Sequence, residues 1–311
     1  MFNVKNNLMN QLNIESIRVT RCAAKGGFKN EINEEVSYLF VEQFFDDRFN
    51  KIKEVILSEE GDEEQIILYS YNNDNKLIAE QHQFIFDEIE EKTNFIYHDG
   101  LLVEKRKEFS YGSIETTIYS YNQDKLPTLI KVVDDHGEEE ESEVFEYEGK
   151  NLIHYVKQNA LIGKDTELWL KYDEKNRLIE EKKWTHNDLK TFTSHYNYTK
   201  NEQEPDVKIM NEKGAVVEAH IKQCNDKNQV VMHEIQYVNN GLKTLITSYE
   251  YNEFDKVVAL EAINQNKVTE RSLIASYDEK GLLTSELKSE YEVAIGSINT
   301  FTLNYEYTFH K

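Results

Sequence analysis

The stretch Tyr69-Ser-Tyr71-Asn-Asn-Asp-Asn-Lys-Leu77 places two tyrosines one residue apart, directly before a polar run that ends in leucine. The same order returns as Tyr119-Ser-Tyr121-Asn-Gln-Asp-Lys-Leu126 and as Tyr249-Glu-Tyr251-Asn-Glu-Phe-Asp-Lys-Val257. Related copies occur along most of the chain, and we call the residue that precedes each polar run the anchor. The anchors are Phe45, Tyr71, Tyr97, Tyr121, Tyr147, Tyr172, Tyr198, Cys224, Tyr251 and Tyr277. Their steady spacing of 24 to 27 residues indicates an internal repeat.

Each repeat has the pattern of a β-hairpin. Before the anchor, large side chains stand at every second position, as in Ile67, Tyr69 and Tyr71, and a period of two is typical of a strand. The Asn, Asp, Lys and Gly residues after the anchor favour a tight turn. A second alternating segment follows, for example Leu178 to Trp184. One unit therefore predicts two antiparallel strands joined by a short turn.

The repeat predicts an all-β protein, an antiparallel meander of about twenty strands. Only two prolines occur, which agrees with a sheet because proline cannot donate to a strand ladder. A flat sheet of this size would be unusual, and its apolar face must be covered. We therefore expect it to wind into a curved, spiral or partly shell-like sheet. Residues 45–311 form the repeat domain, and residues 1–44 are a divergent cap or a decayed repeat. Helix is conceivable only at Met1–Leu12 and Ile32–Val41.

The motif resembles the tyrosine-aspartate (YD) repeats of the Rhs family. The segments Tyr172-Asp-Glu-Lys-Asn-Arg-Leu178 and Tyr277-Asp-Glu-Lys-Gly-Leu-Leu283 carry the resemblance most clearly, and weaker copies extend it over residues 45–307. In that family such repeats imply a long sheet winding into a hollow shell around a toxic polypeptide. Units here are longer, and no Asp-Pro-x-Gly segment of the autocleaving core occurs. We expect a divergent relative without self-cleavage and without a separate toxin domain.

The net charge and the N-terminal sequence limit the classes of partner and the cellular compartment that we expect. The chain of 311 residues has a net charge of −22, which disfavours nucleic acid because phosphates repel an acidic protein. No apolar run is long enough to span a bilayer, so we expect no membrane partner. The first residues lack the apolar core of a secretory signal, and Cys22 and Cys224 form no disulfide pattern. These features favour the cytoplasm, although export without a signal stays open.

Known catalytic motifs are absent from the sequence. The nine histidines include no HExxH pair, and no GxSxG, P-loop or GxGxxG segment occurs. Close carboxylate pairs could still serve a glycosidase, but most Asp and Glu residues fall in turns or on alternate strand positions. We expect no enzymatic activity, no catalytic residues and no cofactor.

The densest anionic cluster is a candidate contact surface for a basic partner. It comprises Asp134, Asp135, Glu138, Glu139, Glu140 and Glu141. Residues 1–150 contain 33 acidic and 16 basic residues, a net charge of −17, and such a field can steer a basic protein toward its site. Solubility and protection of exposed sheet edges would also explain the charge. The cluster could recruit Ca²⁺, but a solvated loop is the simpler interpretation, and we assign no metal site.

Three functional interpretations follow from the sequence. The first is a non-enzymatic scaffold whose extended curved sheet holds a protein partner, since repeat proteins present extended surfaces. The second is an immunity protein or an orphan shell protein of an Rhs-type toxin or secretion system. The third is a carbohydrate-binding protein that uses aromatic faces such as Trp169 and Trp184. We prefer the first; the oligomeric state stays open.

Overall fold

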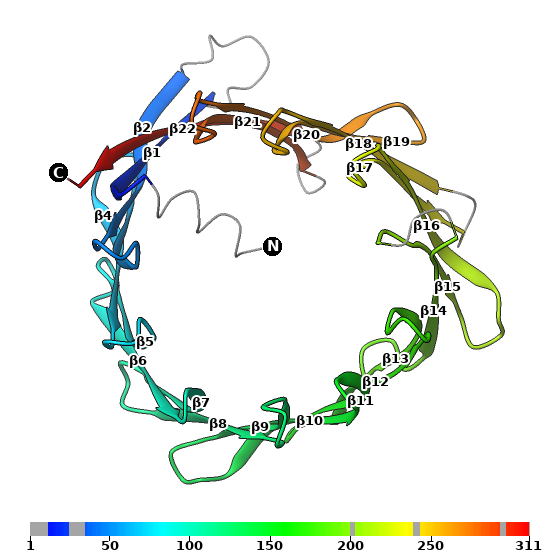
Figure 1. The fold of residues 1–311 in the computed structure, drawn as a ribbon. Helices are drawn as coiled ribbons and strands as arrows, with labels where there is room; N and C mark the ends of the chain where they lie inside the picture. Colours follow the sequence, from blue (N-terminus) through cyan, green and yellow to red (C-terminus); the bar gives the residue numbers. More distant parts are fainter. Residues whose placement is uncertain (1–11, 25–34, 200–202, 239–242, 293–296, 311) are drawn as a thin grey trace.

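A computed structural model describes residues 12–24, 35–199, 203–238, 243–292 and 297–310. These residues form one 22-stranded sheet (Figure 1). The strands are β1 (Ile14–Ala24), β2 (Glu35–Phe45), β3 (Lys51–Leu57), β4 (Glu63–Tyr71), β5 (Leu77–Phe84), β6 (Ile89–His98), β7 (Leu101–Glu108), β8 (Ile114–Tyr121), β9 (Pro127–Val133), β10 (Glu139–Glu148), β11 (Asn151–Asn159), β12 (Gly163–Tyr172), β13 (Leu178–Thr185), β14 (Thr191–Asn197), β15 (Asp206–Met210), β16 (Val216–Cys224), β17 (Val230–Tyr237), β18 (Lys243–Tyr251), β19 (Val257–Asn264), β20 (Thr269–Tyr277), β21 (Leu283–Glu292) and β22 (Ser297–Phe309).

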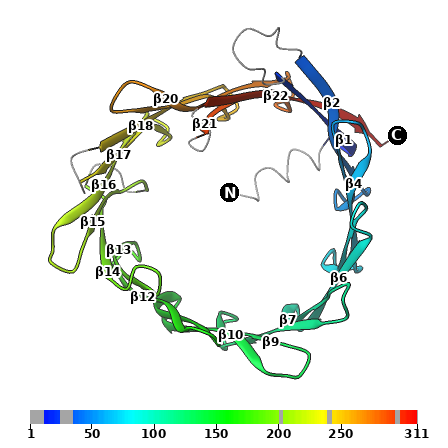
Figure 2. The same cartoon turned by 180° about the vertical axis from the view of Figure 1, so that it is seen from behind.

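The sheet is an antiparallel meander that closes into a barrel. Strands that follow one another along the chain are hydrogen-bonded neighbours, and β1 also pairs antiparallel with β22, with Ile17 opposite Tyr307 and Arg21 opposite Leu303. The all-β meander is thus confirmed, whereas the expected spiral or partly shell-like sheet is wrong. Closure has a clear physical reason: pairing the two outermost strands satisfies the backbone groups that a spiral would leave at two free edges. Figure 2 shows the ring from behind.

The sequence anchors mark the ends of every second strand. Tyr71, Tyr121, Tyr172, Tyr251 and Tyr277 each end a strand, and the other anchors lie within one residue of a strand end. Because the strands alternate in direction, all turns that follow anchors lie at one end of the barrel, which we call the anchor rim. The remaining connections form the opposite end, the distal rim. In Figure 1 the distal loops between β9 and β10 and between β15 and β16 extend outside the ring.

An acidic or amide side chain organises most of the five-residue turns, whereas the turns that begin at Ser58 and Phe109 lack one at this position. In the turn after Tyr71, the Oδ1 atom of Asn72 accepts the backbone N–H groups of Asp74 and Lys76, each at 3.0 Å. Asn75 then adopts a φ of 64°, a left-handed conformation that asparagine tolerates. The same bonds recur around Asn122, Asp173, Asn211, Asn225, Asn252, Asn264 and Asp278. The Asn and Asp residues of the repeat are therefore turn formers.

Several of the anchor tyrosines connect their hairpin to the one before it. The hydroxyl of Tyr71 donates to the backbone carbonyl of Lys51 at 3.0 Å, and that of Tyr251 donates to the carbonyl of Val230 at 2.8 Å. Equivalent bonds join Tyr97 to Leu77, Tyr121 to Leu102, Tyr198 to Leu178 and Tyr277 to Val257. Tyr307 in β22 is not an anchor, but it makes the same kind of bond to Leu283. In each case the acceptor is the residue that begins the second strand of the preceding hairpin, or its neighbour. This bond explains why tyrosine recurs at the anchor position.

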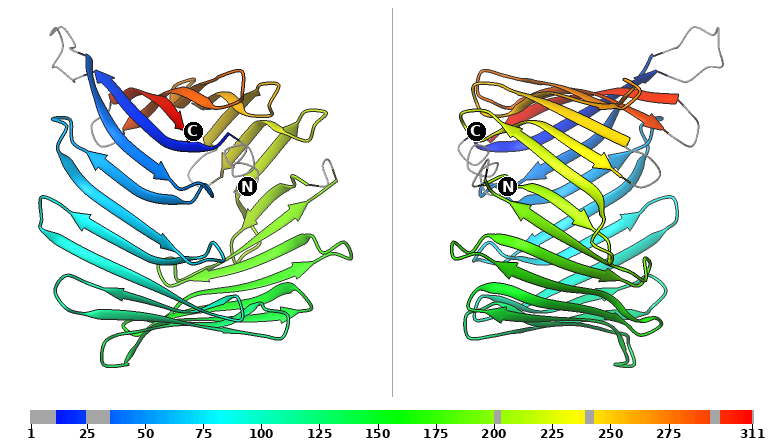
Figure 3. Two further views of the ribbon diagram at one scale, coloured as in Figure 1. Left: turned by 60° about the vertical axis from the view of Figure 1, so that its left-hand side comes forward. Right: turned by 90° about the vertical axis from the view of Figure 1, so that its right-hand side faces the viewer.

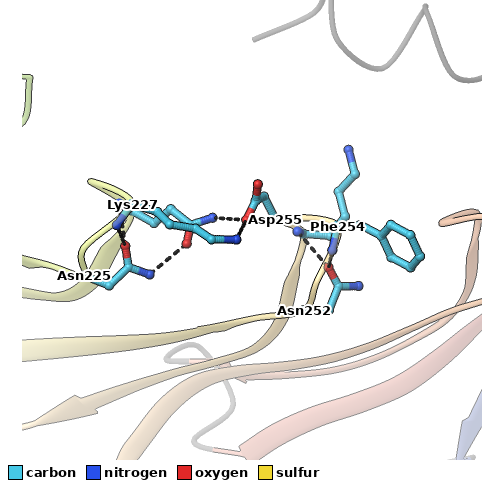
Figure 4. A network of polar contacts seen from close by, with 7 residues as sticks. Asn225, Lys227, Asn252, Phe254 and Asp255 are labelled. Carbon is cyan, nitrogen blue, oxygen red and sulfur yellow. Dashed lines mark hydrogen bonds and ion pairs between the residues drawn. The ribbon is translucent and has the colours of Figure 1, made fainter.

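Polar contacts also link neighbouring turns along the anchor rim. Figure 4 shows Asn225 and Asn252 in two adjacent turns, with Lys227 reaching across to Asp255. The Nζ atom of Lys227 and the Nε2 atom of Gln229 donate to Asp255 Oδ1 at 2.7 and 3.1 Å. Further bridges join Asn50 to Asn75, Lys76 to Gly100 and Asn151 to Asn176. The anchor rim is thus a laterally connected polar surface.

Burial is concentrated where the barrel closes. Ile14, Ile17, Val19, Phe45 and Leu282 form a buried cluster, against which Tyr305, Tyr307 and other residues pack. Elsewhere most side chains are half-buried, as expected for strands that wrap around a wide ring in one layer (Figure 3). Ladder hydrogen bonds, turns and cross-strand pairs therefore carry much of the stability.

The N-terminal expectations have different outcomes. Residues 35–41 lie in β2 and not in a helix, because β1 and β3 on either side complete its ladder. Residues 32–34 and Met1–Gln11 lie outside the described residues. The division at residue 44 stays a prediction, although β1 and β2 belong to the same sheet as the repeats.

A disulfide between Arg18→Cys and Glu306→Cys tests closure, in a background with Cys22→Ser and Cys224→Ser. These residues are paired neighbours on β1 and β22, and such partners lie at a distance that a disulfide can bridge. We expect rapid oxidation to an intramolecular link, seen as faster migration on a non-reducing denaturing gel. The matched pair Arg18→Cys with Glu174→Cys should not link, because Glu174 lies in the turn between β12 and β13, elsewhere on the ring. An open sheet would leave both pairs unlinked.

Replacing Tyr307 by Phe removes the bond to the Leu283 carbonyl and should cost about 1 kcal/mol near neutral pH. Burial raises the pKa of Tyr307 from 10.0 to about 12. A raised tyrosine pKa favours the folded state below pH 10, and this contribution is lost as the pH rises to about 12. Urea unfolding across this range should therefore show a shallower loss of stability for the variant than for the native chain. Parallel pH profiles would contradict the assignment.

Candidate functional site: the distal rim

The distal rim differs from the anchor rim in its side chains. Turn tips on the anchor rim are mostly polar, with Phe254, 41% exposed, as an exception. On the distal rim, Phe86 is 65% exposed, Tyr111 is 76% exposed and Leu161 is 94% exposed. They belong to the connections between β5 and β6, β7 and β8, and β11 and β12. Large apolar side chains that gather at one exposed surface often mark a contact site.

Carboxylates surround these apolar tips. We define the acidic sector as residues 58–64, 85–91, 109–115, 134–141 and 159–163, which are five successive distal connections with the adjoining strand ends. It contains 16 Asp and Glu residues and no Lys or Arg. Much of the acidity of residues 1–150 therefore gathers on one arc of one rim.

The predicted acidic cluster lies at the centre of this sector and borders a groove. Asp134, Glu138, Glu139, Glu140 and Glu141 line an open groove of about 570 Å³. Across it lie Glu115 from β8, Val132 from β9, Asn159 at the end of β11 and the next two residues, Ala160 and Leu161. The structure thus brings five of the six predicted residues together with a neighbouring loop, while Asp135 stands beside them in the turn.

These carboxylates have different local roles. The Oδ1 atom of Asp134 accepts the backbone N–H groups of His136 and Glu138 at 3.0 and 2.8 Å, so this residue forms the turn. Asp135 Oδ1 lies 2.6 Å from His136 Nδ1. Asp134, Asp135 and His136 place potential ligand atoms within 4.8 Å of one another, but they are solvated and Asp134 is already engaged. We assign no metal site to them.

Two of the glutamates are already neutralised by lysines. Glu139 pairs with Lys131 at 2.8 Å, and this bond holds the pKa of the Glu139 carboxyl below its ordinary value. Glu141 pairs with Lys157 at 2.9 Å, and its pKa is lowered for the same reason. Within the described residues, no ion pair is found for Glu115, Glu138 or Glu140. The described residues therefore neutralise none of these three carboxylates.

Local contacts hold the ring of Tyr111 and the backbone at Leu161. The ring of Tyr111 stacks on Phe109 with centroids 5.3 Å apart. Leu161 receives a fixed backbone, because its N–H donates to Asn159 Oδ1 at 2.9 Å and the N–H of Ala160 donates to the Glu140 carbonyl at 2.8 Å. A loop whose backbone is ordered before binding loses less entropy when it is covered.

The sequence prediction identified the acidic cluster but missed the apolar tips. Their signal lies in connections where polar residues are expected, namely Ile85-Phe-Asp-Glu88, Phe109-Ser-Tyr-Gly112 and Ala160-Leu-Ile-Gly163. An aromatic or aliphatic residue at the tip of a hairpin has no core to enter, so its exposure could have been inferred.

Comparisons with known proteins assign no family. No family model matches the chain, and no curated protein matches it. One similar structure is a chain of the crystal structure of TcdB2-TccC3-Cdc42, with 12% identity and a TM-score of 0.41, covering 84% of this chain. TcdB2-TccC3 without the hypervariable C-terminal region has 10% identity, a TM-score of 0.38 and 86% coverage of this chain. This chain spans about 17% of the length of either one.

A porin-like protein from Bacteroides uniformis is also similar, with 9% identity and a TM-score of 0.32, covering 96% of this chain and 97% of its own. At these scores the likenesses carry no argument about function, and the Rhs resemblance rests on the sequence motif. Among the described residues, no helix has the length and apolar character needed to cross a membrane.

Replacing Asp134 should separate turn formation from surface charge. Asp134→Ala removes the acceptor for two backbone N–H groups and should lower the free energy of unfolding by about 1 kcal/mol. Asp134→Asn keeps an oxygen acceptor, as Asn122 and Asn252 do in equivalent turns, and should leave stability nearly unchanged. Urea unfolding of both variants checks this. Equal destabilisation by the two would contradict the role of Oδ1.

Proposed function

We propose that this protein is a non-enzymatic binding scaffold whose rigid ring of strands holds a polypeptide partner at the distal rim. The observation that carries the proposal is the groove of the acidic sector, where exposed Leu161 lies beside Glu115, Glu138 and Glu140, three carboxylates with no ion pair among the residues that the structure describes. Interfaces combine buried apolar anchors with a polar surround, and this groove offers both.

The closed sheet supports this role physically. Every strand of the meander is paired on both sides, so the distal loops are mounted on a continuous wall. Ligand-contacting loops on a rigid framework are a common arrangement in binding proteins. The interaction surface would be presented with little reorganisation of the strands beneath it.

Site-specific photo-crosslinking tests the proposal. A photoreactive amino acid at position 161 should link a polypeptide in cells that make the protein, whereas the same group at position 254 on the anchor rim should not. Mass spectrometry then identifies the linked peptide.

The triple variant Glu115→Gln, Glu138→Gln and Glu140→Gln should reduce the crosslink at position 161. Its matched control is Glu174→Gln, Glu253→Gln and Glu279→Gln, which removes the same charge from exposed anchor-rim turns. Equal crosslinking at both rims, or a crosslink that both triple variants reduce alike, would overturn the proposal.

A further inference from the structure

Phe86, Tyr111 and Leu161 lie on one arc of the distal rim, each at the tip of a loop that is exposed to solvent. We propose that they form a docking track for an extended, cationic segment of the partner, with apolar side chains spaced to meet these three tips. This inference rests on the proposed function and adds the chemistry and conformation of the bound segment.

Charge decides among the possible occupants of the apolar tips. The 16 carboxylates of the acidic sector are accompanied by no Lys or Arg within it, and strand lysines neutralise only some of them, as in the pair of Lys107 with Glu91. The same sector of a second copy would add like charge, and an anionic lipid surface would be repelled in the same way. A polypeptide with lysines or arginines between its apolar residues complements the sector.

The spacing of the tips favours an extended conformation. Successive distal loops are one hairpin apart, which is two strand spacings or about 10 Å. Tyr111 follows Phe86 by one such step, and Leu161 follows Tyr111 by two. An extended chain advances about 3.3 Å per residue, so about ten to twelve residues cover the three tips.

A helix fits the same track less well. At about 1.5 Å per residue, it would need roughly twenty residues for the same distance. The rim is also curved (Figure 1), and a straight helix would leave it before the third tip, whereas an extended chain can follow it.

Synthetic peptides provide the test, with binding measured by fluorescence anisotropy on the full-length protein. The probe is a labelled peptide of about twelve residues with leucine at every third position and lysine between. Comparison peptides replace leucine by serine, or gather the leucines at one end. We expect the spaced peptide to bind at least about tenfold more tightly than the serine peptide, and its affinity to fall with added salt.

Rim variants locate the bound peptide. Tyr111→Ser and Leu161→Ser should each weaken binding about tenfold, while Phe254→Ser on the anchor rim should have no effect. All three residues are exposed, so the variants should fold, and circular dichroism checks this. Equal binding of the spaced and serine peptides, or binding that Phe254→Ser weakens as much as Leu161→Ser does, would overturn the inference.

Two outcomes separate this inference from the proposed function. A polypeptide crosslinked at position 161 that lacks a basic segment with spaced apolar residues would leave the scaffold role intact and refute the docking track. Zwitterionic lipid vesicles are the second probe. Vesicle binding that Leu161→Ser abolishes, without peptide binding, would assign the apolar tips to lipid and overturn the inference.

Discussion

The pairing of β1 with β22 is the contact on which the architecture depends, because the ring has few fully buried residues to hold it together in any other way. Ile17 and Val19 on β1 meet Tyr307 and Tyr305 on β22, and the buried cluster lies at this junction. With this pair formed, both outermost strands have a neighbour on each side. Without it, both would be free edges, and the half-buried wall would have little packing to keep its curvature.

The repeated unit makes this closure possible. Several hairpins combine a turn held by Asn or Asp with a tyrosine hydroxyl bound to the hairpin before it, as in the bond from Tyr251 to Val230. Both contacts are local or between adjacent units, so the same geometry is repeated along the chain. Repetition of one angle between neighbours generates a smooth curve, in the way that repeat proteins generate superhelices.

The distance along the chain over which a residue acts explains which features could be predicted from the sequence. The anchors and the Asn or Asp residues after them act over a few residues or one repeat, so Tyr71 and Asn72 indicated a strand end and a turn correctly. Closure depends on the accumulated twist and stagger of all strands, and no single motif encodes it. For this reason the meeting of Ile17 with Tyr307, far apart in the chain, was not foreseen.

The candidate site, too, could be predicted from the sequence only in part. The charge of Glu138 to Glu141 is visible in the sequence, but the groove also needs Glu115 and Leu161 from neighbouring hairpins. The pairing of Glu139 with Lys131 and Glu141 with Lys157 further distinguishes residues that look equivalent in the sequence.

The even number of strands also determines how the ring can be attached to anything else. β1 begins and β22 ends on the anchor rim, where the His310 N–H donates to the Asn13 carbonyl at 2.9 Å. A tether or fusion partner joined beside Asn13 or beside His310 would therefore be attached at the anchor rim in both cases. A molecule immobilised in this way on a bead or sensor chip would have its anchor rim toward the support and its distal rim exposed to the solution.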